Sequence, residues 1–216
     1  RSIVWPRGKV LGGSSAINGL VYIRGQREDY EHWRQLGNEG WGYNDVLPYF
    51  RKAENQARGS NQYHGSGGPI EVSDIRDKRK ICDAFVEAAV QSGIPRNDDF
   101  NGAEQEGVGN FQTTSKNGRR CSSAVGYLKP IWHRNNLNIE TDAMVMKVLF
   151  DGTRASGVIY RQHGQDKTVH VKNEIILAGG AVNSPQLLQL SGIGPAAYLH
   201  ALGINIVSDS PGVGAD

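Results

Sequence analysis

The sequence predicts an α/β fold with an inserted α+β region, and three observations lead to this prediction. Residues 28–36, 46–57 and 83–92 carry apolar side chains at the spacing of helices. Residues 137–172 alternate between apolar and polar side chains at the period of strands. An unbroken apolar run at 175–178 then leads through a glycine turn into a short helix, which is typical of a strand buried on both faces.

The first half of the chain is expected to be mainly helical, with short strands between the helices. The helix over 28–36 is predicted to end near Gly37, because glycine is common just past a helix end. The next helix has Pro48 near its start, where the missing N–H is tolerated. A loop rich in Gly, Ser and Asn over 59–69 and a strand at 70–72 are expected to follow.

Further elements are predicted before the strand pattern sets in. A polar loop over 97–110 is expected to lead into a strand at 111–114. Ser122 or Ser123 then offers a hydroxyl that can cap a helix running towards Trp132.

The second half is predicted to be a strand meander. Asp151-Gly152 and His163-Gly164 separate alternating segments, and such Gly-containing pairs are typical of hairpin turns. The strands expected around these turns are 137–141, 144–150, 155–162 and 168–172.

A short helix is predicted after the apolar run at 175–178. Asn183 or Ser184 can cap it, Pro185 fits its first helical position, and Gly192 lies just past its end.

Charge and composition exclude several classes of function. The formal net charge is +2, which gives no electrostatic reason to expect a nucleic-acid partner. No apolar run approaches the length needed to span a membrane. Cys82 and Cys121 are isolated, so they predict neither a disulfide framework nor a metal site, and they fit a reducing compartment. None of the six histidines has metal-ligand spacing, and we interpret His64 as structural.

The candidate functional segment is the glycine-rich stretch at residues 8–19. Gly12 and Gly13 lack Cβ atoms, so their backbone N–H groups can approach a ligand closely. Ser14 and Asn18 add polar side chains beside them. This combination suits an anion or a flat polar ring, although a tight connector of no further function is the alternative interpretation.

Two stretches together resemble the signatures of the glucose–methanol–choline (GMC) oxidoreductases, a family of FAD-dependent alcohol dehydrogenases and oxidases. Residues 8–18 resemble the family's Gly-[Lys/Arg]-x-[aliphatic]-Gly-Gly-Ser-Ser-x-[aliphatic]-Asn element. Residues 180–194 resemble its Gly-Ala-x-x-Ser-Pro-x-Leu-Leu-x-x-Ser-Gly-Ile-Gly element. The phrase Gly118-Arg119-Arg120 between them is also similar to the family, and the resemblance is greatest to its choline and alcohol dehydrogenase-like branch.

The resemblance implies a portion of an FAD/NAD(P)-binding Rossmann-like domain with a substrate-domain insertion. Residues 1–26 and 136–216 would be parts of a discontinuous FAD-binding domain, and residues 27–135 would contribute to the substrate side. The cofactor-binding residues implied by the family pattern are Val10, Gly12, Gly13, Asn18, Gly19, Leu20, Val21, Val145 and Gly179.

The same resemblance implies oxidation of an alcohol to an aldehyde or ketone, with hydride transfer to flavin N5. No Gly-x-Gly-x-x-Gly follows a strand near the start, and both ends stop inside family motifs, so we expect an internal fragment of a longer protein. The family's catalytic histidine would lie beyond residue 216, and the isolated fragment is expected to be inactive. Ala16 and Ile17 stand where some members attach FAD through histidine, so non-covalent FAD is predicted.

The implied partners are a small alcohol and an electron acceptor, either a quinone or oxygen, with no nucleic acid and no metal. We expect a protein that is cytoplasmic or bound to the cytoplasmic side of a membrane, and the sequence does not decide about peripheral membrane association. Two alternatives stay open: a hydroxynitrile lyase of the same family with structural FAD, and a flavin-binding fragment without catalysis.

Overall fold

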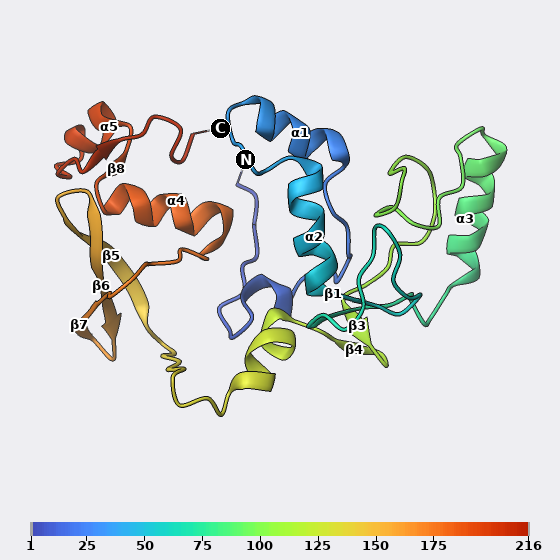
Figure 1. Cartoon of the computed structure of the whole chain (residues 1–216), viewed down its shortest axis with the longest axis horizontal. Helices are drawn as coiled ribbons and strands as arrows, with labels where there is room; N and C mark the ends of the chain where they lie inside the picture. Colours follow the sequence, from blue (N-terminus) through green and yellow to red (C-terminus); the bar gives the residue numbers. More distant parts are fainter. Residues whose placement is uncertain (1, 216) are drawn as a thin grey trace. The chain divides into compact units, whose positions relative to one another are not determined.

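A computed structural model describes residues 2–215, which divide into two compact units. The N-terminal unit extends to Leu137, and the C-terminal unit begins at Asn138. Figure 1 shows the first unit in blue to yellow-green and the second unit in yellow to red, with its strand meander in yellow to orange. Within the described residues, no helix has the length and hydropathy needed to cross a membrane.

The N-terminal unit contains three α-helices, α1 (Arg27–Gln35), α2 (Tyr43–Ala53) and α3 (Lys80–Gln91). The helices α1 and α2 begin in the same way. In each, an aspartate of the first turn accepts a hydrogen bond from the backbone N–H of the residue before the helix. Asp29 accepts from Gln26 at 2.9 Å, and Asp45 accepts from Gly42 at 3.1 Å. Each contact satisfies one otherwise unpaired backbone donor.

Aromatic side chains join α1 to α2. The ring of Tyr30, a buried residue, lies 5.5 Å from Trp33, 6.2 Å from Tyr43 and 5.8 Å from Phe50, measured between centroids. Edge-to-face pairs at these distances add stabilisation to the area they bury. Gly37, at φ 97°, ends α1 as its sequence position predicts.

The strands of this unit are short. β1 (Glu54–Gln56) pairs in parallel with β2 (Ile70–Val72), and β3 (Ser115–Lys116) pairs antiparallel with β4 (Arg119–Arg120). Further helical turns are η1 (Gly13–Ala16), the π-helical η2 (Ala124–Leu128) and η3 (Lys129–Ile131).

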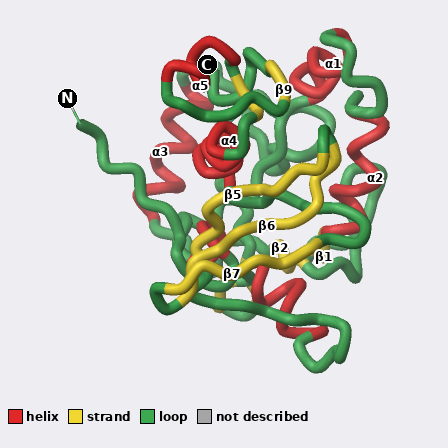
Figure 2. Tube along the Cα trace, turned by 90° about the vertical axis from the view of Figure 1, so that its left-hand side faces the viewer, coloured by secondary structure: helices red, strands yellow, loops and turns green. Residues whose placement is uncertain are grey.

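The C-terminal unit is built on a three-stranded antiparallel sheet in the order β5–β6–β7. Its elements are β5 (Met144–Asp151), β6 (Arg154–Gln162), β7 (Gln165–His170), α4 (Gly180–Leu190), β8 (Ile193–Gly194), α5 (Ala196–Ala201) and β9 (Ser208–Asp209). Figure 2 shows the three long strands side by side, with α4 next to β5. Positive φ angles at Gly152, His163 and Gly164 confirm both predicted hairpin turns.

Several boundaries differ from the sequence-based expectations. The helix predicted over 46–57 ends at Ala53, because Glu54–Gln56 pair with β2 instead. The strand predicted at 111–114 is reduced to single bridges at Thr113, since its partners Val21 and Ser73 each reach it at one position only. The strand predicted at 137–141 does not form.

The segment at 122–132 is helical but irregular. Ser122 caps it as predicted, because its Oγ accepts the N–H of Val125 at 3.3 Å. The turns that follow are π and 3-10 turns rather than a regular α-helix.

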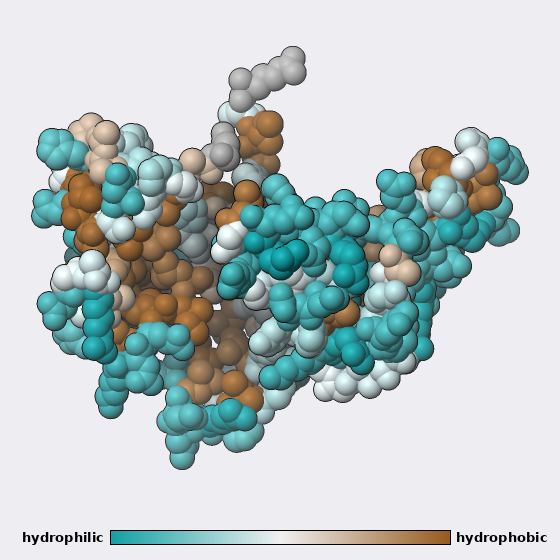
Figure 3. Space-filling view, turned by 45° about the horizontal axis from the view of Figure 1, so that its top comes forward, coloured by the Kyte–Doolittle hydropathy of each residue, from teal (hydrophilic) through white to brown (hydrophobic). Residues whose placement is uncertain are grey.

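The apolar run at 175–178 is not a buried strand. It has no ladder partner among residues 2–215, and Ile176 is 79% exposed. A strand of a parallel sheet is buried only when neighbouring strands and helices cover it, and the described chain supplies none here. Figure 3 shows that hydrophobic residues reach the viewed surface in broad areas.

The helix after this run begins earlier than predicted. α4 starts at Gly180, and Pro185 lies inside it rather than at its first position. Gly180 adopts φ 85°, and the N–H of Gly179 donates to Ser184 Oγ at 3.0 Å, so an extra turn forms before the proline. Gly192, at φ 94°, does lie just past the helix end.

Ser191 joins α4 to β5 through two hydrogen bonds. Its side chain is 1% exposed, its Oγ donates to the Leu187 carbonyl at 2.6 Å, and it accepts the N–H of Val148 at 2.8 Å. We expect Ser191→Ala to lower the free energy of unfolding by about 1–3 kcal/mol, because the buried Val148 N–H loses its acceptor.

Urea-induced unfolding of the full-length protein checks this prediction. The exposed Ser208 is the matched control, and Ser208→Ala should change the free energy by less than about 0.5 kcal/mol. If both substitutions changed the free energy of unfolding equally, the hydrogen bonds of Ser191 would not contribute specifically to stability.

Candidate functional site

The glycine-rich loop folds into a tight turn that places backbone at the surface. The N–H of Gly13 donates to the Val10 carbonyl at 2.9 Å, and η1 follows directly. Gly12 and Gly13 have φ angles of 90° and 52°, which side-chain-bearing residues rarely adopt. The glycines in this stretch are therefore required by the backbone conformation itself.

The two faces of this turn differ. A Cβ on Gly12 would lie 3.2 Å from Ala124 Cβ and from Ser122 Oγ, so this glycine packs against the start of η2. Apart from the adjacent residues and the turn's own backbone, no described protein atom lies within 4 Å of the position that a Cβ on Gly13 or on Gly19 would take. The backbone of the latter two residues is accessible to a ligand.

Apolar side chains before and after the turn are also exposed. Val10 and Val21 are 58% and 48% exposed, and Ile17 is 50% exposed. Apolar side chains exposed beside accessible backbone suit a flat ring that lies against them. Leu20 adopts φ 68°, a conformation uncommon for a residue other than glycine.

Neighbouring segments hold Leu20 in this conformation. Its N–H donates to Asn18 Oδ1 at 3.2 Å, and its carbonyl accepts the N–H of Thr114 at 2.9 Å. Two residues later, the N–H of Tyr22 donates to the Gln112 carbonyl at 2.9 Å. A strained conformation persists only where its surroundings fix it, and such conformations cluster at ligand sites.

The other two predicted cofactor residues belong to the C-terminal unit. Val145 is 40% exposed on β5, beside a register shift that leaves Met146 without a direct partner on β6. Such a bulge frees backbone groups from the ladder. Gly179 is exposed and directly precedes α4. The approach of these residues to the glycine-rich loop around one cofactor stays a prediction.

An ionic cluster with three buried members and the half-buried Asp99 lies on the chain immediately after the loop, and the sequence did not reveal it. It consists of Arg24, Glu54, His64 and Asp99. Arg24 Nη2 donates to Glu54 Oε2 at 2.7 Å, and the two side chains are 3% and 0% exposed. Two cations and two anions give the cluster no net charge, which is the condition for burying ions at low cost.

His64 is the link between two carboxylates. Its Nδ1 lies 2.9 Å from Glu54 Oε1, and its Nε2 lies 2.9 Å from Asp99 Oδ2. The hydrogen bonds with Asp99 and with Glu54 raise the pKa of His64 from 6.5 to about 9. The same contact with His64 lowers the pKa of Asp99. An imidazolium donates from both nitrogens, so His64 links Glu54 to Asp99, and its structural role stays an interpretation that these contacts support.

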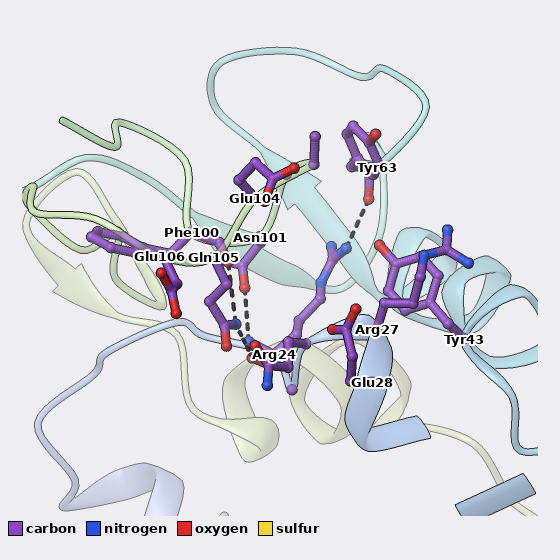
Figure 4. A pocket seen from close by; sticks show the side chains of 14 residues that line it. Arg24, Arg27, Glu28, Tyr43, Tyr63, Phe100, Asn101, Glu104, Gln105 and Glu106 are labelled. Carbon is purple, nitrogen blue, oxygen red and sulfur yellow. Dashed lines mark hydrogen bonds between the residues drawn. The ribbon is translucent and has the colours of Figure 1, made fainter. Parts of the chain in front are cut away.

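A pocket of about 430 Å³ lies beside this cluster and is separate from the glycine-rich loop. Figure 4 shows Arg24 at its edge, with Nη1 donating to the Tyr63 carbonyl at 2.8 Å. None of the residues that line the pocket is among the predicted cofactor residues. Among residues 2–215, no three His, Cys, Asp or Glu side chains are grouped so that they could hold a metal ion.

The His64 pKa predicts a pH dependence of stability. The folded-state pKa is raised above the unfolded value of 6.5, so the stabilisation is complete below about pH 6.5. It is lost as the pH rises through about 9. We expect the free energy of unfolding to fall more steeply between pH 6.5 and 9.5 in the wild-type full-length protein than in His64→Gln.

Denaturant unfolding at a series of pH values measures this difference. His133 is exposed, so His133→Gln should reproduce the wild-type slope. A His64→Gln protein with the wild-type slope would show that the imidazolium does not stabilise the fold.

Comparison with known proteins identifies the family of the chain. The sequence model described as GMC oxidoreductase matches residues 1–215. The chain is 49% identical over 214 residues to human mitochondrial choline dehydrogenase and 47% identical to the oxygen-dependent choline dehydrogenase of Brucella ovis. Each alignment covers 99% of this chain, but only 36% and 39% of the relatives, respectively.

The chain is also similar to solved structures over almost its whole length. A pyridoxine 4-oxidase from Mesorbium loti has a TM-score of 0.89 at 33% identity, covering 96% of this chain and 41% of the other. An FAD-dependent oxidoreductase from Chaetomium thermophilum has a TM-score of 0.89 at 33% identity, covering 95% and 38%. The expected α/β class of an FAD-binding portion is thereby confirmed, and the chain belongs to the GMC oxidoreductase family.

Proposed function

We propose that this chain is part of an FAD-dependent oxidoreductase that acts on the CH–OH group of a small alcohol. The observation that carries the proposal is the open backbone at Gly13, inside the segment that resembles the family's first signature, and at Gly19, directly after that segment. The choline dehydrogenase relatives, at 47–49% identity across almost the whole chain, favour an alcohol as the substrate.

The residues present fit a flavin dinucleotide. Gly13 and Gly19 leave open space where a Cβ would stand, so a ligand can approach the backbone there without meeting a side chain. Asn18 adds an exposed side-chain amide. Val10 and Val21 provide apolar contact for a flat ring. Together these groups match the flavin ring and the adjoining anionic diphosphate of such a cofactor.

The chain's own residues would bind and orient the cofactor. Backbone N–H groups over residues 12–21 would stabilise the negative charge that develops on the ring during reduction. Val145 would hold the adenine through its backbone groups, and Gly179 would allow close approach of the dinucleotide. Bound FAD supplies the acceptor, N5, for the hydride that leaves the alcohol carbon.

The rest of the proposal concerns the catalytic base, the electron acceptor, the domain boundaries and the location of the enzyme. A histidine beyond residue 216 would take the hydroxyl proton, and a quinone or oxygen would reoxidise the cofactor. Residues 1–26 and 136–216 would share the FAD-binding domain, with 27–135 on the substrate side. We expect the enzyme in the cytoplasm or at the cytoplasmic side of a membrane.

Substitution of Gly13 tests the loop assignment. We expect Gly13→Val in the full-length protein to abolish flavin retention, because a branched side chain would occupy the space of the ligand. Gel filtration followed by measurement of flavin absorbance per protein reports the occupancy.

The matched control is Gly40→Val. Gly40 also has a positive φ of 81° with no protein atom near its Cβ position, but it lies between α1 and α2. It should be strained to a similar degree and still retain flavin. Full flavin occupancy in Gly13→Val would contradict the assignment.

We also predict that the FAD is non-covalent. Ala16 and Ile17 carry no nucleophile at the place where some family members attach the flavin. Acid precipitation of the holoenzyme should therefore release yellow flavin into the supernatant. Colour that stays with the pellet would refute non-covalent binding.

A further inference from the structure

A single short segment, residues 120–124, contacts both ends of the η1 turn. We call it the clamp segment. At one end, Ser123 N–H donates to Ser15 Oγ at 2.9 Å, and Ser123 Oγ donates to the Gly12 carbonyl at 3.2 Å. Ser15 Oγ also donates to the Gly12 carbonyl, so two hydroxyls share this acceptor.

Arg120 holds the other end of the turn. Its Nη1 donates to the Ser15 carbonyl at 3.0 Å and to Asn18 Oδ1 at 2.7 Å, and its Nη2 donates to the Asn18 carbonyl at 2.7 Å. Carbonyls at the end of a helical turn lack partners within the turn, and a cation is a favourable partner for them. The planar guanidinium can reach all three oxygens at once because its donors form a rigid fork.

These contacts also determine which way the Asn18 amide faces. Its Oδ1 accepts from Arg120 and from the Leu20 N–H, at 2.7 and 3.2 Å. A flipped amide would place its NH₂ group against two donors, which is unfavourable. Arg120 therefore fixes the oxygen towards the protein and leaves the NH₂ group as the donor available to a ligand.

We propose that Arg120 is a positioning residue for the flavin, acting through the backbone of residues 15–18 and through the Asn18 amide. This inference rests on the proposed function, since it assumes that the loop contacts FAD. Arg120 itself takes no part in the chemical reaction. It holds the loop backbone and the amide in the orientation in which they meet the cofactor.

The test compares Arg120→Met with Arg119→Met in the full-length protein. Arg119 is the adjacent residue of β4, it is exposed, and no side-chain hydrogen bond involves it within residues 2–215. Apoprotein is titrated with FAD, and the visible absorption spectrum and reduction potential of the bound flavin are recorded. Loss of charged hydrogen bonds predicts a Kd for FAD that rises about tenfold to hundredfold in Arg120→Met, with Arg119→Met within about twofold of wild type.

The spectrum and the potential separate positioning from a general structural role. A merely structural role would lower stability but leave the absorption bands and the potential of the bound flavin as in the wild type. We expect both to shift in Arg120→Met, and Arg120→Lys, which keeps the charge but loses the fork, to be intermediate. If Arg120→Met does not fold, Arg120→Lys decides by the same measurements.

A double substitution tests the route through Asn18. If Arg120 acts through this amide, Asn18→Ala and Arg120→Met together should weaken FAD binding less than the sum of their separate effects. Wild-type affinity, spectrum and potential in both Arg120 variants would overturn the inference while leaving the proposed function intact. A wild-type protein that binds no FAD would overturn the proposed function itself.

Discussion

The N-terminal unit depends on the buried carboxylate of Glu54. This side chain is 0% exposed, and it accepts hydrogen bonds from Arg24, from His64 and from the N–H of Gly65. An unpaired carboxylate in this position would be strongly destabilising, so every donor that reaches it must come from a correctly placed segment. One carboxylate thus brings together the strand β1, the loop around His64 and the chain that follows the glycine-rich turn.

The glycine-rich loop at residues 8–19 lies next to this anchored chain. Gly12 and Gly13 adopt positive φ angles without steric cost, but the left-handed conformation of Leu20 persists only because its neighbours fix it. The ionic cluster fixes the chain downstream at Arg24, and the clamp segment at 120–124 fixes the turn itself. The loop therefore presents the open backbone at Gly13 and Gly19 in a defined geometry, and a preorganised surface of this kind lowers the cost of binding a ligand.

Much of the fold could be predicted from local patterns. Apolar spacing identified α1 and α3, and the Gly-containing pairs located both turns of the β5–β7 meander. The predictions failed where a partner decides the outcome. Residues 175–178 have the composition of a buried strand, but no neighbour within the described chain pairs with them. The ionic cluster was missed because Arg24, Glu54 and Asp99 are far apart in sequence and of types that usually lie at the surface.

The sequence by itself determined the family and the glycine positions of the tight turn at Gly12 and Gly13, because these depend on residue identity and on local backbone preference. Only the tertiary structure decided that Glu54 is buried, that Arg120 contacts Asn18 and that Leu20 is strained. Charged side chains acquire such roles from what surrounds them in space. The free energy of a buried ion pair, or of a hydrogen bond from a guanidinium to a carbonyl, depends on the distance between the groups and on their desolvation. Both quantities are set by the three-dimensional structure and cannot be obtained from the residue order alone.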